Sequence, residues 1–243
     1  WQSLSALPRF PNHVALRRHF PYRKHIVRLL AITDVHSEQD AMRRILAAAG
    51  KVDLILLGGD LTSFGTVREA MWFVDAARAA APRVFAVAGN CDSPPIDQRL
   101  AELDVTLFGR GRVVEGVGFL GLSAMPRWHG ATYELTEDDL AAALDAGASE
   151  LPAGLRQTVV LSHPPPRYTT TDRTMADEHV GSKALRNFIE AHQPTLVLCG
   201  HIHEARGIDR VGATTVVNCG PAFVGHYALV DLDDEVLVSL RTA

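Results

Sequence analysis

The 243-residue chain has no long apolar run and very little cysteine. No apolar run reaches the roughly 18 residues needed to cross a bilayer, and the N-terminus lacks the long apolar stretch of a signal peptide. The three cysteines, Cys91, Cys199 and Cys219, are odd in number and widely separated, which argues against the disulfide framework of a small secreted protein. These absences predict a protein without a membrane partner, in a reducing, cytoplasmic setting.

The chain also has no internal repeat, low-complexity tract or linker that would divide it. Because 47% of its residues are hydrophobic, it can bury a sizeable core, and we expect one domain over residues 27–243. Residues 1–26 form a basic N-terminal extension. The segment that precedes the first acidic residue, Asp34, has a net charge of +6, and the rest of the chain has a net charge of −10. A basic arm can bind phosphate-rich polymers, but a solvated extension or an oligomer contact is more common. We assign it no function.

Apolar runs alternate with amphipathic segments from residue 27 onward. Runs 27–32, 53–58 and 83–88 are apolar on both faces, as strands of a covered parallel sheet are, and helical spacing is found over 38–49 and 67–80. This order predicts a βαβαβ unit. Three helices begin with the spacing of a capping box, namely Ser37 with Asp40, Thr66 with Glu69 and Thr136 with Asp139.

The rest of the chain predicts a second α/β half facing the first. Segments 105–108 and 112–124 favour antiparallel strands with glycine turns, and a helix is expected near 137–147. A strand over 158–162, a helix over 182–192 and a strand over 195–200 follow, and then a hairpin-like segment over 209–218 and a last apolar segment over 227–240.

Five of the expected strands end in a polar cluster. The clusters are TDVH (33–36), GGD (58–60), GNCD (89–92), SHPP (162–165) and GHIH (200–203). Any one of them has an ordinary explanation as a helix cap or a turn. Five such clusters at the ends of successive strands do not have an ordinary explanation. Since ligands of open α/β sheets bind beyond the carboxyl ends of the strands, we expect the five clusters to lie close together.

The residue types in these clusters indicate metal binding. Asp34 and His36 stand two residues apart, as do His201 and His203, so in an extended segment both side chains of each pair face the same way. Seven side chains are candidate ligands, too many for a single open site: Asp34, His36, Asp60, Asn90, His163, His201 and His203. Two ions fit better, with Asp60 the natural bridge between them.

The charge of such a site predicts an anionic substrate. Two divalent ions bring +4 and the two aspartates return −2, while histidine and asparagine ligands are neutral, so a net +2 remains. Paired ions about 3.5–4 Å apart activate water and stabilise in-line displacement at phosphorus.

In this order, the motifs D-x-H, GD, GN-x-D, H and G-H-x-H resemble the calcineurin-like metallophosphoesterase family, over residues 34–203. The resemblance implies an α/β fold, a four-layer αββα sandwich of two mixed sheets flanked by helices. It also implies two ligand sets. Asp34, His36, Asp60 and His203 would hold one ion, and Asp60, Asn90, His163 and His201 the other.

Cys91 departs from the pattern, because many members of the family have histidine there, thought to protonate the leaving group or hold the phosphate. The GNCD motif resembles the small prokaryotic branch, which includes phosphodiesterases. We expect Cys91 at the rim of the site, acting as a poor substitute for an acid rather than as a metal thiolate or a redox sensor. The candidate catalytic residues are Asp60, Asn90, Cys91 and Asp92.

Other polar residues lie outside the motifs. Segment 164–182 is long, polar and placed between two metal motifs, so it borders the substrate or is simply a solvated loop. Arg167 and His179 are its candidate substrate contacts. His129, His192 and His226 have no motif partner and are expected at the surface or as satisfied polar groups, and Cys199 and Cys219 as small buried residues.

The function expected from the motifs is that of a binuclear metal-dependent phosphodiesterase, in which a metal-bridging hydroxide attacks phosphorus. Nitrogen-rich ligation favours Mn, Fe, Zn, Co or Ni over Mg or Ca, and Mn is our first choice. The expected substrate is a small phosphoester such as a nucleotide or cyclic nucleotide. Nucleic acid is not an expected partner. The oligomeric state is left open, with a homodimer as one alternative. The alternatives are a phosphomonoesterase or protein phosphatase, and a catalytically idle metal-binding scaffold.

Overall fold

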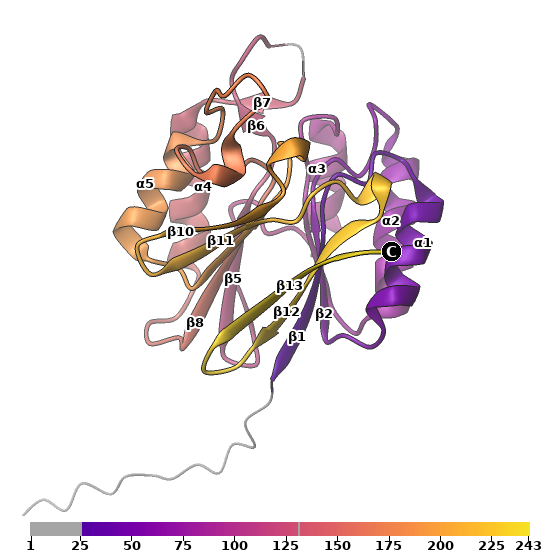
Figure 1. Cartoon of the computed structure of the whole chain (residues 1–243), viewed down its shortest axis with the longest axis horizontal. Coiled ribbons are helices and arrows are strands. Elements are labelled where there is room, and N and C mark those ends of the chain that lie inside the picture. The colour runs from indigo at the N-terminus through magenta and orange to yellow at the C-terminus, as the bar shows by residue number, and fades with distance from the viewer. Residues whose placement is uncertain (1–25, 131) are drawn as a thin grey trace, which may run out of the picture.

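The computed structural model describes residues 26–130 and 132–243, so the basic extension 1–26, apart from Ile26, lies outside the described residues. Two β-sheets pack face to face in the middle of the molecule, with helices on the outer face of each (Figure 1). The predicted four-layer αββα sandwich is confirmed.

The first half of the chain contributes three helices and most of one sheet. Its elements are β1 (Val27–Ile32), α1 (Gln39–Ala49), β2 (Leu54–Gly58), α2 (Val67–Ala80), β3 (Val84–Val87), α3 (Pro94–Glu102), β4 (Arg112–Val114) and β5 (Val117–Leu122). The remaining elements are β6 (Met125–Pro126), β7 (Glu134–Leu135), α4 (Glu137–Ser149), β8 (Gln157–Ser162), α5 (Lys183–His192), β9 (Leu196–Cys199), β10 (Gly207–Val211), β11 (Thr214–Asn218), β12 (His226–Leu232) and β13 (Val236–Thr242). Short 3-10 helices cover Thr170–Asp172, His203–Ala205 and Ala222–Val224.

Both large sheets have a parallel centre. The first has the order β13-β12-β1-β2-β3, and the second the order β10-β11-β9-β8-β5-β4. Strands β1, β2 and β3 run parallel to one another, as do β5, β8, β9 and β11. The antiparallel strands predicted over 112–124 and the hairpin predicted over 209–218 form at the sheet edges, and segment 227–240 forms another antiparallel pair.

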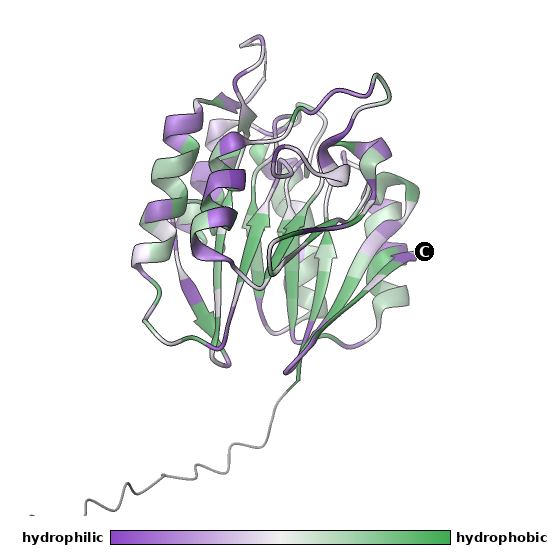
Figure 2. Cartoon of the chain, turned by 60° about the vertical axis from the view of Figure 1, so that its left-hand side comes forward, coloured by the Kyte–Doolittle hydropathy of each residue, from purple (hydrophilic) through white to green (hydrophobic). Residues whose placement is uncertain are grey.

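Alternating side chains of the central strands build separate cores. In β1, Leu30 and Ile32 pack toward the first helical layer, whereas Leu29 and Ala31 pack between the sheets. In the second sheet, Val159 and Leu161 face the first sheet, and Val160 faces α4 and α5. Both faces of these central strands are therefore buried, which explains their continuous apolar runs (Figure 2).

Two of the three expected helix caps form. Thr136 makes the reciprocal capping box with Asp139 at α4, and Thr66 accepts a hydrogen bond from the Glu69 amide at α2. The box predicted for Ser37 and Asp40 is wrong, because α1 is preceded by Glu38 and has no side-chain cap. Ser37 instead has φ +70°, and its hydroxyl accepts a hydrogen bond from the Ser63 amide, 3.1 Å away.

The segment 105–108 is not the strand that was predicted. It makes two single bridges, Thr106 with Ala86 of β3 and Phe108 with Gly121 of β5, so it crosses from the edge of one sheet to the other. Helix α3, which we did not predict, starts with Pro94 and Pro95. Proline is tolerated there because the first helical amides have no partner within the helix.

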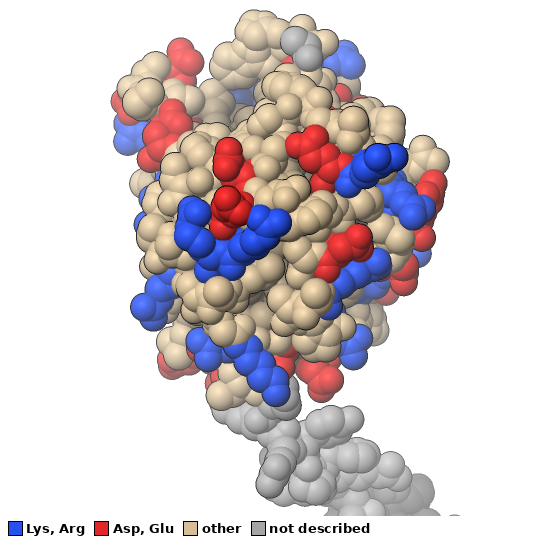
Figure 3. Space-filling view, turned by 90° about the vertical axis from the view of Figure 1, so that its right-hand side faces the viewer, with Lys and Arg blue, Asp and Glu red and all other residues tan. Residues whose placement is uncertain are grey.

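The outer face of the first helical layer carries charges of both signs side by side (Figure 3). On α1, Arg43 Nη1 lies 2.6 Å from Asp40 Oδ1, one turn away. Such exposed pairs contribute little to stability, and this mixed surface is that of a solvated layer. None of the helices between residues 26 and 243, Ala131 aside, combines the length and apolar character that a bilayer span needs.

Candidate metal centre

The five polar clusters meet at one end of the sandwich. Asp34 follows β1, Asp60 follows β2 and Asn90 follows β3, at the carboxyl ends of three parallel strands. His163 and the pair His201 and His203 follow the parallel strands β8 and β9 of the facing sheet. The convergence expected from the sequence therefore occurs, with side chains from both sheets facing one another.

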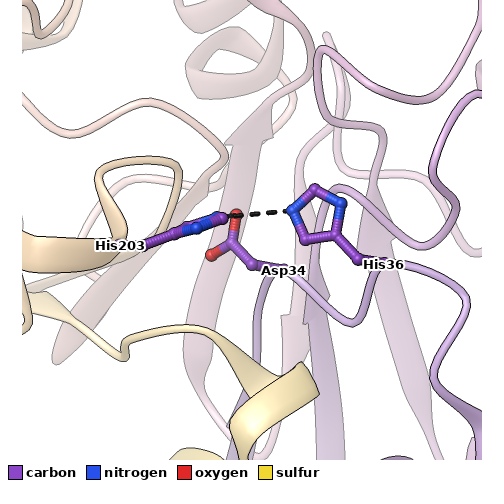
Figure 4. Close-up of side chains that lie close together, drawn as sticks. All are labelled: Asp34, His36 and His203. Carbon is purple, nitrogen blue, oxygen red and sulfur yellow. Dashed lines mark hydrogen bonds and ion pairs between the residues drawn. The ribbon is translucent and has the colours of Figure 1, made fainter.

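Four of the predicted ligands form the first group. His36 and His203 approach Asp34 from opposite sides (Figure 4), with 3.3 Å between their Nε2 atoms. His203 Nε2 lies 3.4 Å from Asp34 Oδ1, and His36 Nε2 lies 3.5 Å from Asp60 Oδ2. Metal–ligand bonds of about 2.0–2.2 Å place neighbouring ligand atoms roughly 3.0–3.5 Å apart, so this spacing suits an ion.

The second group includes the other oxygen of Asp60. His163 Nε2 lies 3.5 Å from Asp60 Oδ1 and 2.9 Å from Asn90 Oδ1, and the His201 ring stands 5.0 Å from the His163 ring, centroid to centroid. One oxygen of Asp60 thus faces His36 of the first group, and the other faces His163 of the second. This is the arrangement expected of a carboxylate shared by two ions.

Backbone groups orient three of the central side chains. The His163 Nδ1 atom lies 3.0 Å from the Gly58 carbonyl oxygen, which can only accept, so Nδ1 carries the proton and Nε2 is left with a lone pair toward the site. Asp34 accepts a hydrogen bond from the His201 amide, 3.1 Å from each of its oxygens. The amide of Cys91 donates to Asp60 Oδ1 at 2.7 Å.

The glycines that precede two ligands make room for carboxylates. A Cβ atom on Gly89 would come 2.1 Å from Asp60 Oδ1, and one on Gly200 would come 2.1 Å from Asp34 Oδ2. Any larger residue would push these aspartates out of place. The motifs GN and GH therefore need their glycines for this close approach.

Four of the seven predicted ligands have a strained backbone. The φ angles are +57° at Asp34, +49° at His36, +49° at Asp60 and +67° at His201. For residues other than glycine this conformation costs about 1–3 kcal/mol each, and it is concentrated at functional sites, where the surrounding structure holds it. The strain supports the view that these positions are shaped for binding rather than for stability.

Burial controls the electrostatics of the group. Asp34 and Asp60 are almost completely inaccessible to solvent. Burial raises the pKa of Asp60 to about 6, and for Asp34 it is outweighed by the hydrogen bond and charge of the neighbouring histidines, which lower the pKa to about 2. Burial also lowers the pKa of His201 to about 3, so this ring is neutral and able to ligate. Two buried carboxylates among imidazoles are a donor set that fits divalent ions.

Cys91 lies closer to the predicted ligands than the rim position that we expected. Its Sγ atom belongs to a group of donor atoms, with His36 and Asp60, that all lie within 4.8 Å of one another. Its side chain is half-buried, and burial, followed by the charge of Asp60, raises the pKa of the thiol. Asn90 Nδ2 stands 3.4 Å from the sulfur.

Asp92, predicted to be catalytic, is used to join two loops. Its carboxylate accepts hydrogen bonds from the amides of Leu61, Thr62 and Gly89, at 2.9–3.1 Å, and from the Thr62 hydroxyl at 3.0 Å. These contacts tie the GGD loop to the GNCD loop and so fix Asp60 beside Asn90. They favour a positioning role for Asp92 over contact with substrate.

Arg167 and His179 lie together, but away from the predicted ligands. Both line a cavity of about 670 Å³, and none of the seven predicted metal ligands lines it. Among the remaining residues, Cys199 and Cys219 are buried as expected. His192 stacks on Phe188 and His129 lies edge-on to Trp128, so they are occupied by ordinary packing.

Two residues of the site were not found from the sequence. Asn218, at the end of β11, is buried and donates to the carbonyl groups of Gly200 and Ile202, 3.3 and 2.8 Å away, which holds the GHIH turn. Phe223 packs edge-on against the rings of His36 and His203, with centroids 5.5 and 5.2 Å away. A polar residue at one more strand end was a signal for Asn218, whereas no pattern marked Phe223.

Comparison with known proteins places the chain in a family. A model of the calcineurin-like phosphoesterase family matches residues 27–205. The uncharacterized protein MJ1162 of Methanocaldococcus jannaschii is 30% identical over 201 residues, 80% of this chain and 88% of that protein. In fold, the chain is similar to TT1561 of Thermus thermophilus (TM-score 0.67, 20% identity, 88% of this chain and 99% of the other). It is also similar to a dimetal phosphatase from Danio rerio (TM-score 0.59, 13% identity, 89% and 96%). With the family match covering most of its length, the chain belongs to the calcineurin-like phosphoesterase family.

Proposed function

We propose that this protein hydrolyses small phosphodiesters with the help of two divalent metal ions, manganese being the first choice. The observation that carries the proposal is the position of Asp60, whose two oxygens each lie 3.5 Å from a histidine of a different ligand group. The family depends on two divalent ions, and the donor atoms of this chain suit such a pair. Nucleotides and cyclic nucleotides are the substrates that we propose first.

When bound, the two ions would activate water and neutralise charge at phosphorus. Asp34, His36, Asp60 and His203 would hold one of them, and Asp60, Asn90, His163 and His201 the other. Since only two of these side chains are anionic, the loaded site keeps an excess of positive charge that binds the phosphate oxygens. The Gly58 carbonyl and the amides of Cys91 and His201 orient His163, Asp60 and Asp34 before substrate arrives.

The thiol of Cys91 supports a preference for diesters. A thiol is a weak hydrogen-bond donor, whereas proton transfer to the leaving oxygen by a well-placed acid is worth about 10²–10⁴-fold in rate. Without that help, esters with good leaving groups and strained cyclic diesters are favoured over alkyl monoesters.

The proposal is tested by comparing bis(p-nitrophenyl) phosphate with p-nitrophenyl phosphate in the presence of Mn²⁺. We expect kcat/KM for the diester to exceed that for the monoester by at least about tenfold. The reason is that the monoester loses the help of an acid, which is worth about 10²–10⁴-fold in rate. Faster turnover of the monoester would indicate a phosphomonoesterase. No turnover of either substrate by the metal-loaded protein would indicate an idle scaffold.

Substitution of Cys91 should change the choice between the two substrates. Cys91→His introduces a better donor near the leaving oxygen, so the ratio of monoester to diester turnover is expected to rise by about tenfold or more. Cys91→Ser, of similar size, is expected to keep much of the diester turnover. Both are checked by steady-state kinetics at saturating Mn²⁺ with metal content measured in parallel. If Cys91→Ser lost diester turnover with both ions still bound, the thiol would have a direct role in the reaction.

A further inference from the structure

The cavity lined by Arg167 and His179 is bounded by residues that suit a nucleotide. Its volume of about 670 Å³ is within the range of small-molecule sites. Its lining includes three cations, two aromatic side chains and one histidine: Arg127, Arg167, Lys183, Trp128, Tyr168 and His179. Trp128 is 51% exposed and Tyr168 62%, so two large rings present their surfaces to solvent at a concave site.

The charge of this cavity is positive although the chain as a whole carries −4. In the described part of the chain, Arg127, Arg167 and Lys183 form no ion pair within 4.0 Å. Of the acidic lining residues, Glu137 is already used, because its carboxylate accepts hydrogen bonds from Ser182 Oγ and from the amides of Lys183 and Ala184, at 2.8–2.9 Å. Glu178 is the other, so the lining has a net charge of +1 before His179 is considered.

Arg167 has an unmet hydrogen-bonding need. Its Nε atom is buried and has no hydrogen-bond partner among the described residues. A buried donor without a partner costs about 1–3 kcal/mol, which a ligand or a water molecule can recover. The guanidinium carbon stands 5.2 Å from the centre of the Tyr168 ring, so the cation and the ring are presented together.

The wall that carries Arg167 is rigid. Asp172 is completely buried and accepts hydrogen bonds from the amides of Tyr168, Thr169 and Gly181 at 2.9–3.1 Å, and its Oδ1 lies 2.6 Å from His179 Nδ1. These contacts fold segment 164–182 onto itself, so the cavity exists before a ligand binds, and little ordering entropy is lost on binding.

The two walls of the cavity are both attached to the candidate metal centre. Arg167 is four residues from His163, so their Cα atoms are at most about 14 Å apart. On the other wall, the Tyr133 amide donates to the Asn90 carbonyl at 3.1 Å, and the amide of Trp128 is held by the Glu134 carboxylate, 2.8 Å away. Strands β6 and β7, which flank this wall, lie at the same end of the sandwich as the loops that carry the predicted ligands (Figure 1).

We infer that this cavity receives one arm of the phosphodiester, and that this arm is a nucleoside bearing a further phosphate. Trp128 and Tyr168 offer ring surfaces to the base, and Arg167, Arg127 and Lys183 offer charge to the second phosphate. The inference rests on the proposed function, and it narrows the substrate to a diester with a phosphorylated nucleoside arm, as in a 5′-phosphorylated dinucleotide.

The first experiment compares the dinucleotide pApA with ApA, which lacks the 5′-phosphate, on the manganese-loaded protein. We expect kcat/KM for pApA to exceed that for ApA by about tenfold or more, because hydrogen bonds to charged groups are worth about 1.5–3 kcal/mol. Lys183→Gln should bring this ratio close to one, mainly through a higher KM for pApA. Arg44→Gln, an exposed arginine on α1 in the other helical layer, is the matched control and should keep the ratio.

A second variant tests the ring surface. Trp128→Ala should raise KM for both dinucleotides by about tenfold, since stacking of a base on an aromatic side chain is worth about 1–3 kcal/mol. Its turnover of bis(p-nitrophenyl) phosphate shows whether catalytic competence has been lost more generally. Equal kcat/KM for pApA and ApA in the unmodified protein would overturn the inference while leaving phosphodiesterase activity intact.

A binding measurement keeps the inference testable if no diester is hydrolysed and the proposed function fails. Calorimetric titration with adenosine 3′,5′-bisphosphate should show binding that Arg167→Gln and Trp128→Ala each weaken by about tenfold and that Arg44→Gln leaves unchanged. Thermal melts of each variant check that it is folded. Absence of binding, or equal affinity for adenosine and its bisphosphate, would overturn the assignment of the cavity.

Discussion

Asp60→Asn is expected to reduce kcat/KM for a phosphodiester by about 10³-fold or more, far more than Asn90→Ala does. The two oxygens of the Asp60 carboxylate each lie 3.5 Å from a histidine, one from His36 and the other from His163. The substitution would remove the negative charge that lies between the two proposed ions, and the electrostatic help of such ions is worth several kcal/mol. Asn90 is neutral and belongs to one group, so its loss should cost roughly 10–100-fold.

The comparison is made by steady-state kinetics at saturating Mn²⁺, with the metal content of each variant measured. Asp53→Asn provides a matched control, because Asp53 precedes β2 at the strand end opposite Asp60 and accepts a hydrogen bond from the Arg28 amide. It should change kcat/KM by less than about twofold, as surface substitutions usually do. Comparable losses in Asp60→Asn and Asn90→Ala would mean that Asp60 does not bridge.

That the predicted ligands lie close together could be predicted, because the pattern that indicates it is contained in short segments of the sequence. Each predicted ligand follows a strand whose apolar residues mark it as buried on both faces, and parallel strands bring their carboxyl ends to one edge. The spacing of Asp34 and His36 then indicated which side chains face the same way. The family resemblance supplied the division into two ligand sets, and the position of Asp60 between His36 and His163 supports it.

What could not be predicted depends on contacts between distant loops. The amides of Asp34, His36 and Ser37 donate to carbonyl groups of the 59–61 segment, and this pulls Ser37 out of the capping geometry that its sequence favours. Asp92 is the last residue of a motif that was predicted to be catalytic, but two of the amides that it binds lie 30 and 31 residues earlier in the chain. The cavity beside Arg167 is assembled from separate segments with no common pattern.

The largest effect on stability is expected from removal of metal. Chelation should abolish activity and lower the melting temperature, because Asp34 and Asp60 are buried side by side and lose the cations that offset their charge. An ion present at a hundredfold excess over its Kd stabilises the folded state by about 2.7 kcal/mol. For a domain of this size that corresponds to roughly 5–10 °C per ion. Thermal unfolding with and without chelator, followed by readdition of Mn²⁺, measures the change.

Metal analysis of the same samples counts the ions. The position of Asp60 between two groups of donors leads us to expect two ions per chain at saturating metal, and one or none in His36→Ala or His163→Ala at limiting metal. His192→Ala is the control, since this ring stacks on Phe188 at the end of α5 and lies outside all three groups of donor atoms. It should keep both ions and the full metal-dependent rise in melting temperature. A single ion in the unmodified protein at saturating metal would contradict the shared carboxylate, and with it the charge excess by which the site is proposed to bind a phosphodiester.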